Sequence, residues 1–439
     1  MNLQEAKESN TRFDAFIAAI TNVLGRQGRE EHFLDYSRGL IVTTGRKSVE
    51  PLAAITSPAR VEPKHQSLLH FVGQSEWSDT DVLNKVREKV QPLMERHGPI
   101  KVSIVDDTGF PKKGKHSVGV AHQYCGQLGK QANCQNAVSL SIANHHASLP
   151  VGHQLYLPQE WAKDRERRKK AGVPPKIKFK TKPKIAIDLI RTAKGQGVSV
   201  GVTLADAAYG NNTAFRDDLT ALGVTYAVGI NPTTKVWAPG TGPLSPKKWR
   251  GRGRRPTHLR RNTRHKPISV KKLAMRLPKD AWQTITWREG TNKDLTSRFA
   301  RVRVRPAHGD TKRSEPRPEE WLMIEWPEEE KEPTKHGFST LPEDTPFETM
   351  VDIFKMRWRV ERDYEELKQE VGLGHYEGRS WRGFHHHATI CIAAYAFLVA
   401  ERAIFPPLQF DVRTAAFKKF ALPKNYRPRG SPDSHAASR

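Results

Sequence analysis

Three carboxylates, far apart in the chain, have types and settings that suit metal-assisted phosphate chemistry. Asp106 follows the stretch KVSIV, Asp206 follows VSVGVTLA, and Glu361 lies within FKMRWRVERDYEELK. Carboxylates without histidine or cysteine partners favour hard cations, chiefly Mg²⁺, for which Mn²⁺ can substitute. Two such ions can activate an attacking oxygen and stabilise a leaving oxygen in phosphoryl transfer. We therefore predict a two-metal site, with Asp107 as the alternative to Asp106.

Each acid also has a simpler explanation when it is taken alone. An aspartate at the end of a strand is more often a turn former or a helix cap than a ligand, and Glu361 could belong to a solvated helix face with i, i+4 ion pairs. At 3.6 residues per turn, one face of a continuous helix would present, within about 60°, Phe354, Arg357, Glu361 and Lys368. Basic side chains beside an acid suit clamps on DNA phosphates, so a metal held against a polyanion explains the grouping.

The segments that must position these acids alternate between strand and helix patterns. Helical spacing predicts helices at 184–194 and 212–223. Short β-branched runs predict strands at 101–107, 117–124, 137–144, 198–206 and 224–230. This order predicts an α/β fold with a mixed sheet and flanking helices.

Changes in residue composition and spacing divide the chain into five predicted regions. Helical spacing in 11–24 and 79–95 indicates a helical domain at the N-terminus, and strand-like pieces at 298–306 and 320–326 indicate a β-rich insertion. The predicted regions are a helical domain with candidate DNA contacts (1–97), the first part of a catalytic core (98–230), a β-rich insertion with a basic arm (231–340), the completion of the core by the Glu361 helix and a C-terminal helix (341–422), and a disordered tail (423–439).

The third acid is predicted to lie on one long helix. A Thr-x-x-Glu capping box at Thr345, with proline at the first helical position, starts it, and Gly372 ends it. The apolar run 388–400 is too short to span a bilayer and is expected to form a buried helix. The preceding His385–His387 are expected at the surface or facing phosphates.

The charge of the chain indicates a polyanionic partner. Lysine and arginine number 73 against 47 acids, a formal charge of +26, which favours nucleic acid. The basic runs 165–172, 176–184 and 247–266 could each contact phosphates or form solvated loops. Besides Arg357, Lys368 and Phe354, the candidate DNA-binding residues are Lys112, Lys113, Lys115, Arg250, Arg252, Arg254 and Arg255.

Three cysteines are too few for a disulfide framework and lack zinc-site spacing. That usage fits a reducing cytosol, and the first residues contain no readable signal peptide. We therefore expect a soluble intracellular protein without a membrane partner.

The motifs, taken in order, resemble those of DDE transposases of bacterial insertion sequences. VDDTGFPKKGKHSVGV (105–120) resembles the first-acid motif of that family, and LADAAYGNN (204–212) resembles the second. The branch with a YREK motif has Tyr-x2-Arg-x3-Glu-x6-Lys around the third acid. Arg357, Glu361 and Lys368 match that motif, whereas Phe354 stands in the tyrosine position. The resemblance covers about 65 to 400.

This resemblance implies an RNase H-like fold whose β-rich insertion separates the second and third acids. It implies that Asp106, Asp206 and Glu361 bind the two Mg²⁺ ions, with Asp106 favoured over Asp107 because the family's first acid lies two residues before a threonine, here Thr108. The implied reaction is cleavage at inverted-repeat element ends followed by attack of the 3′-OH on target DNA.

The implied setting is a homodimeric complex on element ends and target DNA in a bacterial cytoplasm, associated with the nucleoid. Some relatives flip a base onto an aromatic residue, for which Trp321, Trp326 and Trp358 are candidates and core packing is the alternative. Two other functions stay open: an RNase H-like nuclease that never joins strands, and a non-catalytic DNA-binding protein derived from a transposase.

Overall fold

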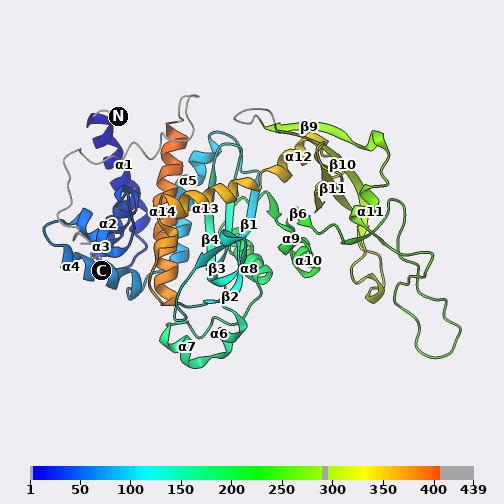
Figure 1. The fold of residues 1–439 in the computed structure, drawn as a ribbon, viewed down its shortest axis with the longest axis horizontal. Coiled ribbons are helices and arrows are strands. Elements are labelled where there is room, and N and C mark those ends of the chain that lie inside the picture. The colour runs from blue at the N-terminus through cyan, green and yellow to red at the C-terminus, as the bar shows by residue number, and fades with distance from the viewer. Residues whose placement is uncertain (1–2, 289–294, 406–439) are drawn as a thin grey trace, which may run out of the picture.

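The computed structural model describes residues 3–288 and 295–405. Within them, twelve strands form one mixed sheet, and the helices pack on it and at one end of it (Figure 1). The predicted α/β, RNase H-like fold class is confirmed. The tail predicted at 423–439 and the last part of the region predicted at 341–422 lie outside the described residues.

The strand that carries the first acid, β1 (Val102–Pro111), lies between β3 and β5 in the sheet. β1 runs antiparallel to β3 and parallel to β5, and β5 runs parallel to β6. β3 is long enough to pair with β2 along its first part and with β4 along its last part. The other strands of this group are β2 (Ala121–Cys125), β3 (Lys130–Ala143), β4 (Ser148–Leu155), β5 (Val202–Ala205) and β6 (Tyr226–Ile230).

The sequence patterns missed β4 and misplaced β2. The β4 segment SLPVGHQL contains Pro150 and Gly152, residues that weaken a strand pattern, and only its pairing with β3 reveals it. The predicted strand 117–124 begins later, at Ala121. The helices that follow β4 and surround β5 are α6 (Gln159–Lys163), α7 (Arg165–Lys170), α8 (Lys182–Gly195), α9 (Ala207–Gly210) and α10 (Thr213–Ala221), and α8 and α10 match the predicted helices.

The inserted segment extends the same sheet. Its last strand, β12, pairs antiparallel with β6, and β11 and β10 continue from it, so the strands predicted at 298–306 and 320–326 are confirmed. The elements of this segment are β7 (Lys235–Trp237), β8 (Ile268–Ser269), α11 (Val270–Ala274), β9 (Gln283–Arg288), β10 (Leu295–Pro306), β11 (Glu320–Trp326) and β12 (Lys335–Ser339). They lie at the opposite end of the sheet from the N-terminal helices (Figure 1).

The N-terminal helices pack around α14 (Trp381–Ile404), as Figure 1 shows. Phe13 of α1, for example, meets Phe397 of α14 edge-on at 5.0 Å between ring centroids. α14 is long and apolar enough to cross a membrane by length and composition, but most of it is buried, which confirms the expected buried helix. The helices are α1 (Leu3–Thr21), α2 (Arg29–Val42), α3 (Val49–Thr56), α4 (Val61–Gly73) and α5 (Asp79–Glu95).

The prediction that His385–His387 lie at the surface is wrong. All three side chains are buried, because α14 is enclosed along most of its circumference. His387 Nδ1 lies 2.9 Å from the Tyr36 hydroxyl, and the His386 ring stacks on Trp77 at 3.7 Å. Burial lowers the pKa of His387 to about 4, so these histidines are neutral packing groups.

The single long helix predicted around Glu361 is also wrong. The chain forms α12 (Phe347–Lys355) and α13 (Trp358–Gln369), separated at Met356 and Arg357. The predicted capping box does not form, since α12 begins after Pro346 without a side-chain cap. α12 packs on the β6 and β9 side of the sheet, whereas α13 packs on β1 and β4, so the two helices follow different parts of one twisted sheet. Gly372, with φ +84°, follows α13 as expected.

Candidate active site

The first two acids lie side by side because of the pairing between β1 and β5. The parallel register joins Val102 to Val202 and Ile104 to Leu204. Asp106 and Asp206 each follow the last of these pairs by two residues, so they stand at the same level where the two strands diverge. Ser103 and Thr203 hold the register from within, with their hydroxyl oxygens 2.9 Å apart in the buried interior.

Asp206 is also a helix cap. Its Oδ1 accepts hydrogen bonds from the backbone N–H of Ala208 at 2.9 Å and of Tyr209 at 3.3 Å, at the start of the short α9. The capping explanation and the ligand explanation are therefore compatible, since the cap uses one carboxylate oxygen and fixes the orientation of the other.

An arginine connects the first and third acids. Arg357 Nη1 lies 3.3 Å from Asp106 Oδ2, and Arg357 Nη2 lies 2.5 Å from Glu361 Oε1. Arg357 immediately precedes α13, and Glu361 is four residues further, one turn along the helix. Asp106 Oδ1 meanwhile accepts a hydrogen bond from the Asp107 N–H at 2.8 Å. One guanidinium therefore holds the two carboxylates on the same side of the sheet.

Buried polar contacts fix α13 across the sheet. Asp363 accepts hydrogen bonds from the Ser148 hydroxyl at 2.5 Å and from the Tyr395 hydroxyl at 2.9 Å, which ties α13 to β4 and α14. Further along, Lys368 Nζ donates to the Gly109 carbonyl of β1 at 2.8 Å. Burial lowers the pKa of Lys368 to about 8. These contacts set the position of α13, and with it that of Glu361, over the sheet.

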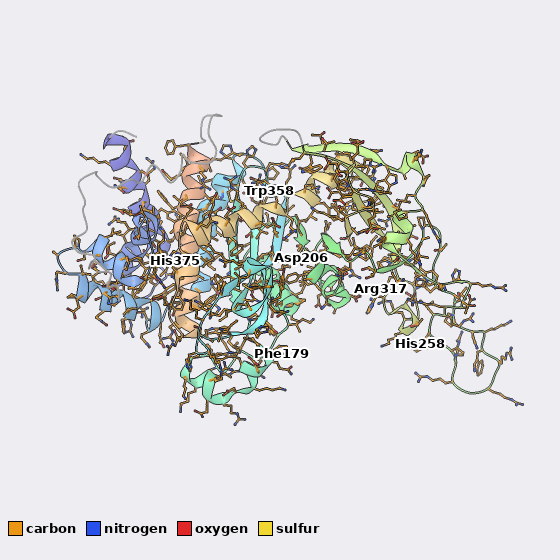
Figure 2. All side chains as sticks on the ribbon, viewed as in Figure 1. Phe179, Asp206, His258, Arg317, Trp358 and His375 are labelled. Atoms are coloured by element: carbon orange, nitrogen blue, oxygen red, sulfur yellow. The ribbon has the colours of Figure 1, made fainter. Side chains whose placement is uncertain are left out.

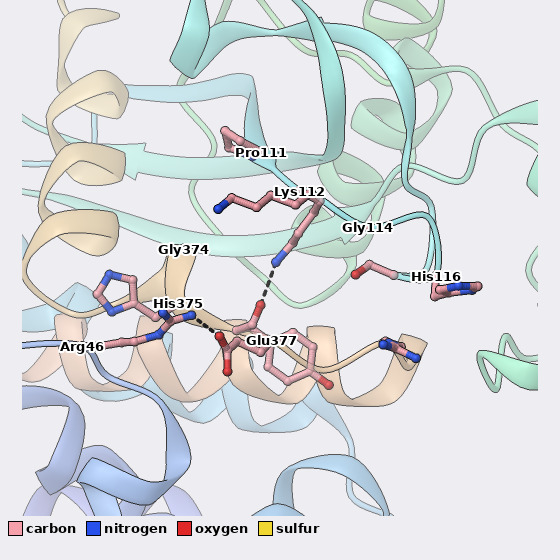
Figure 3. A pocket seen from close by; sticks show the side chains of 12 residues that line it. Arg46, Pro111, Lys112, Gly114, His116, Gly374, His375 and Glu377 are labelled. Atoms are coloured by element: carbon pink, nitrogen blue, oxygen red, sulfur yellow. Dashed lines mark hydrogen bonds and ion pairs between the residues drawn. The ribbon is translucent and has the colours of Figure 1, made fainter. Parts of the chain in front are cut away.

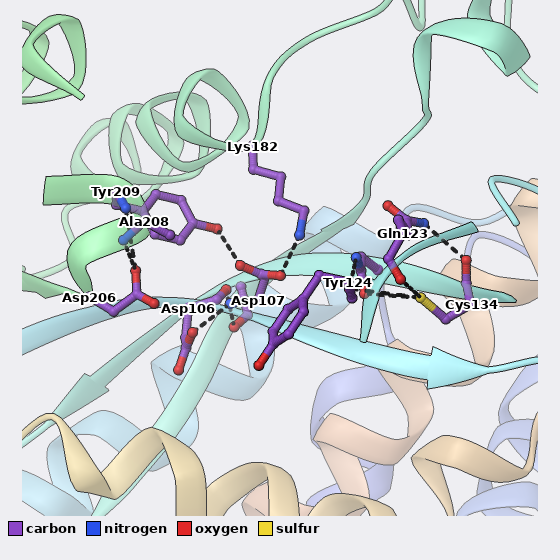
Figure 4. Close-up of polar contacts among 11 residues, drawn as sticks. Asp106, Asp107, Gln123, Tyr124, Cys134, Lys182, Asp206, Ala208 and Tyr209 are labelled. Carbon is purple, nitrogen blue, oxygen red and sulfur yellow. Dashed lines mark hydrogen bonds and ion pairs between the residues drawn. The ribbon is translucent and has the colours of Figure 1, made fainter. Parts of the chain in front are cut away.

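Asp107 points to the other face of β1, as successive strand residues do. Its Oδ2 accepts from Lys182 Nζ at 2.5 Å and its Oδ1 from the Tyr209 hydroxyl at 3.4 Å. Figure 4 shows Asp107 turned toward Lys182 and Tyr209, with Asp106 turned the other way. This arrangement supports Asp106 over Asp107 as the first acid of the group.

The site has an excess of negative charge. The pKa of Asp106 is raised to about 7, chiefly by burial and in addition by the neighbouring carboxylates of Asp206 and Asp107, while Arg357 opposes the shift. Burial and the same three aspartates raise the pKa of the Tyr209 hydroxyl well above its usual range. A carboxylate that is costly to ionise among other carboxylates favours a bound cation.

The three carboxylates are donor types that fit Mg²⁺ or Mn²⁺. In this structure an arginine side chain lies between two of them. Within residues 3–288 and 295–405, no three histidine, cysteine, aspartate or glutamate side chains are arranged closely enough to hold a metal ion. The Arg357 guanidinium stands between Asp106 and Glu361. The Glu361 side chain is 58% exposed, so it has room to exchange this partner for another cation. Asp106, Asp206 and Glu361 offer the carboxylate oxygens that such an ion favours.

The other predicted DNA-binding residues fall into two groups. Phe354 belongs to α12 and packs against Gly337 of β12, so it does not share a helix face with Glu361. Lys112 Nζ donates to the Tyr376 carbonyl at 2.7 Å. The exposed residues are Lys113, Lys115, Arg250, Arg252, Arg254 and Arg255. The four arginines lie between β7 and β8, in a segment whose His258 lies at the edge of the molecule, away from Asp206 (Figure 2).

Sequence reasoning missed two residues that contact Asp107, next to the first acid. Lys182 opens α8 and pairs with Asp107, and no spacing rule connects positions 75 residues apart. Tyr209 could have been noticed, because it lies three residues after Asp206, where a capping aspartate places the first turn of a helix. Of the tryptophans, Trp321 lies with its ring centroid 4.8 Å from the Arg301 guanidinium, and its Nε1 donates to the Pro342 carbonyl at 3.3 Å.

The fold and the site define an RNase H-like α/β protein that aligns two aspartates at the ends of adjacent parallel strands. A family model described as DDE superfamily endonuclease matches residues 20–294, and the chain belongs to this family. The match includes Asp106 and Asp206 and ends before Glu361.

A relative supports the same class. The chain is 32% identical over 193 residues to a protein of Microchaete diplosiphon described as a probable transposase for insertion sequence element IS701. The matched segment is 44% of this chain and 46% of the relative, so the chain spans about half the length of that protein.

Proposed function

We propose that the protein is a DNA transposase that cleaves DNA at the ends of an insertion element and joins those ends to target DNA. The observation that carries the proposal is the placement of three acids. Asp106 and Asp206 share one level of the parallel β1–β5 register, and Arg357 holds Glu361 to Asp106. Family membership and the IS701 relative support the same reaction class.

In this proposal Asp106, Asp206 and Glu361 hold two Mg²⁺ ions, or Mn²⁺ in their place. When bound, the ions supply activation of an attacking water or 3′-OH and stabilisation of the leaving oxygen. Asp206 is oriented by its cap on α9, Asp106 by the Asp107 N–H, and Glu361 completes the set from an exposed position. Arg357, released from the carboxylates, is placed to bind a DNA phosphate.

The proposal includes the YREK branch of the family. Arg357, Glu361 and Lys368 keep the spacing of that motif, and the Lys368 ammonium lies against β1 two to three residues beyond the aspartates. Phe354 departs from the motif, and its packing on Gly337 assigns it a structural role. The tyrosine hydroxyl of the motif therefore has no counterpart at this position.

The proposed partners are the inverted-repeat ends of an element and target DNA, bound by a homodimer in the bacterial cytoplasm and nucleoid. The formal charge of +26 supports a polyanionic partner. The IS701 relative is matched over only about half its length. The proposed partners and the dimer therefore rest on the charge and on the family resemblance, and not on that relative.

The proposal is tested by incubating the protein with labelled duplexes of the inverted repeats that bracket its reading frame. We expect nicked and joined products in Mg²⁺ and their loss in Asp206→Asn and Glu361→Gln. Glu365→Gln is the matched control, since Glu365 is an exposed acid on the same helix, about one turn further on, and it should retain activity. Full strand transfer by Glu361→Gln would contradict the proposal.

The same acids could serve hydrolysis alone, and the family description, an endonuclease, favours this as the second candidate. The two functions differ in their products, because a nuclease leaves nicked DNA and a transposase covalently joins an end to a target. Joined molecules in the assay above would exclude the nuclease. Nicking of the element ends without joining, in mixtures that also contain target DNA, would favour the nuclease.

A further inference from the structure

A basic pocket of about 740 Å³ lies outside the candidate active site. Three segments that are far apart in the sequence line it: the end of β1 with the turn after it at 111–117, the segment before α14 at 374–379, and Arg46 from the connection between α2 and α3. Figure 3 shows these segments facing one another across the pocket. The acids of the candidate active site do not line it.

The lining is strongly cationic. It includes Arg46, Lys112, Lys113 and Arg379, together with the rings of His116 and His375, against the acid Glu377. Arg46 forms an ion pair with Glu377, in which the two side chains are 65% and 62% exposed. Exposed pairs contribute little to stability, so an incoming anion can replace Glu377 at low cost.

The walls of the pocket are fixed by contacts between its segments. The Val118 N–H donates to the Arg379 carbonyl at 3.1 Å, and Lys112 Nζ donates to the Tyr376 carbonyl at 2.7 Å. On the third side, the Lys47 N–H donates to His375 Nδ1 at 3.0 Å. The pocket therefore exists before a ligand binds, which reduces the entropic cost of binding.

The basic surface continues from the pocket onto α7. Arg167 Nη2 lies 3.4 Å from the Lys115 carbonyl, and the Trp381 N–H donates to the Ala171 carbonyl at 2.8 Å. α7 itself is the sequence RERRKK. A pocket with a basic helix at its rim suits an extended anion such as a nucleic-acid strand better than a small free anion.

The distance to the acids gives a register for the DNA. Pro111, at the pocket, follows Asp106 by five residues in the same strand β1, and at about 3.3 Å per residue this separates them by about 17 Å. One DNA strand advances about 3.4 Å per nucleotide along the helix axis. The pocket therefore lies about five nucleotides from a bond held at the acids.

We propose that this pocket binds backbone phosphates of the DNA substrate about five nucleotides from the cleaved bond, through Lys113, Arg379 and Arg46. The inference rests on the proposed function for the position of the cleaved bond, but the basic pocket itself does not depend on cleavage. Contacts at this distance fix the register of the duplex on the acids and carry no base information.

The first test measures affinity for a random-sequence duplex by fluorescence anisotropy over a range of salt concentrations. The variant is Lys113→Glu/Arg379→Glu, whose two side chains are exposed. The matched control is Lys89→Glu/Arg96→Glu, likewise exposed, at the end of α5 where the adjacent His97 contacts Ala403. That is the opposite end of α14 from the pocket, about 36 Å away along a helix of 24 residues.

We expect the pocket variant to bind the duplex at least about tenfold more weakly than the control variant. The slope of log affinity against log salt concentration should fall by the equivalent of roughly two phosphate contacts. Equal affinities of the two variants would overturn the proposal. Because this arm requires no cleavage, its outcome is independent of the proposed function.

The second test replaces single phosphates of an element-end duplex with neutral methylphosphonates. In the wild-type protein, sensitivity is expected about four to six nucleotides from the cleaved bond, and the pocket variant should lose that sensitivity. If the wild-type protein cleaves and the variant keeps the same sensitivity, the pocket proposal fails and the transposase proposal stands. If DNA binding depends on the pocket but no cleavage occurs at any end, the pocket stands and the transposase proposal fails.

Discussion

Replacing Asp106 with asparagine is expected to stabilise the fold above neutral pH and to abolish cleavage. Burial and the neighbouring carboxylates raise the pKa of Asp106 from 3.8 to about 7, a shift of about three units. At about 1.36 kcal/mol per pKa unit, removal of this ionisable group can raise the free energy of unfolding by at most about 4 kcal/mol. The side chain is 21% exposed, and its asparagine would face the Arg357 guanidinium less favourably, so we expect a gain of about 1–3 kcal/mol.

The sign of the pH dependence follows from proton binding. Between about pH 4 and pH 7 the folded protein keeps a proton on Asp106 that the unfolded chain releases. The stability that this carboxyl contributes is therefore present at low pH and is lost as the pH rises through its folded pKa. The difference in the free energy of unfolding between Asp106→Asn and wild type should be near zero at about pH 4 and reach its plateau above about pH 7.

The measurement is urea denaturation of both proteins across this pH range, with and without Mg²⁺. A metal that binds only the folded protein stabilises it by about 2.7 kcal/mol at one hundred times its Kd, so Mg²⁺ should stabilise wild type and leave Asp106→Asn unchanged. Asp107→Asn is the control, because it removes an acid that pairs with Lys182 and should lower stability. An Asp106→Asn protein that is less stable than wild type above pH 7, or an equal Mg²⁺ effect on both, would refute this account of the site.

Three further predictions concern the elements that hold the site. Asp363→Ala leaves two buried hydroxyls without their acceptor and should lower the free energy of unfolding by about 2–4 kcal/mol in urea, whereas Asp363→Asn should lose about 1 kcal/mol. Burial lowers the pKa of Lys368 to about 8, below its unfolded value of about 10.4, so wild-type stability should rise with pH between these values, and Lys368→Met should not show this rise. Gly210→Ala would place a Cβ 1.9 Å from the Gly229 carbonyl oxygen. It should destabilise the protein by at least about 2 kcal/mol and impair cleavage through Asp206, whereas Gly114→Ala, with nothing within 4 Å, should be nearly neutral.

Local patterns in the sequence were sufficient for the strands that carry the two aspartates. The β-branched runs before Asp106 and Asp206 predicted strands that the structure contains, and the apolar residues Ile353, Val360 and Leu367, which repeat every seven positions, are buried. These signals depend on residues a few positions apart, because side-chain direction alternates along a strand and repeats about every turn along a helix.

The break between α12 and α13 had no such signal. The pattern around Met356 predicts a continuous helix, and the Met356 side chain itself is buried. Two helices form because α12 packs on β6 and β9 while α13 packs on β1 and β4. Similarly, no local feature distinguished His385–His387 from surface residues, and their burial follows from the helices that enclose α14.

By itself, the sequence determined the strands before the aspartates and the cationic character of the chain, and it predicted the three acids and their order. The tertiary structure decided that Asp106 and Asp206 share one level, that Arg357 holds Glu361 beside them, and that residues 46, 112 and 379 enclose one pocket. The physical reason is the range of the interactions. Propensity and periodicity act over a few residues, whereas strand register and the packing of α13 join positions 100 and 251 residues apart.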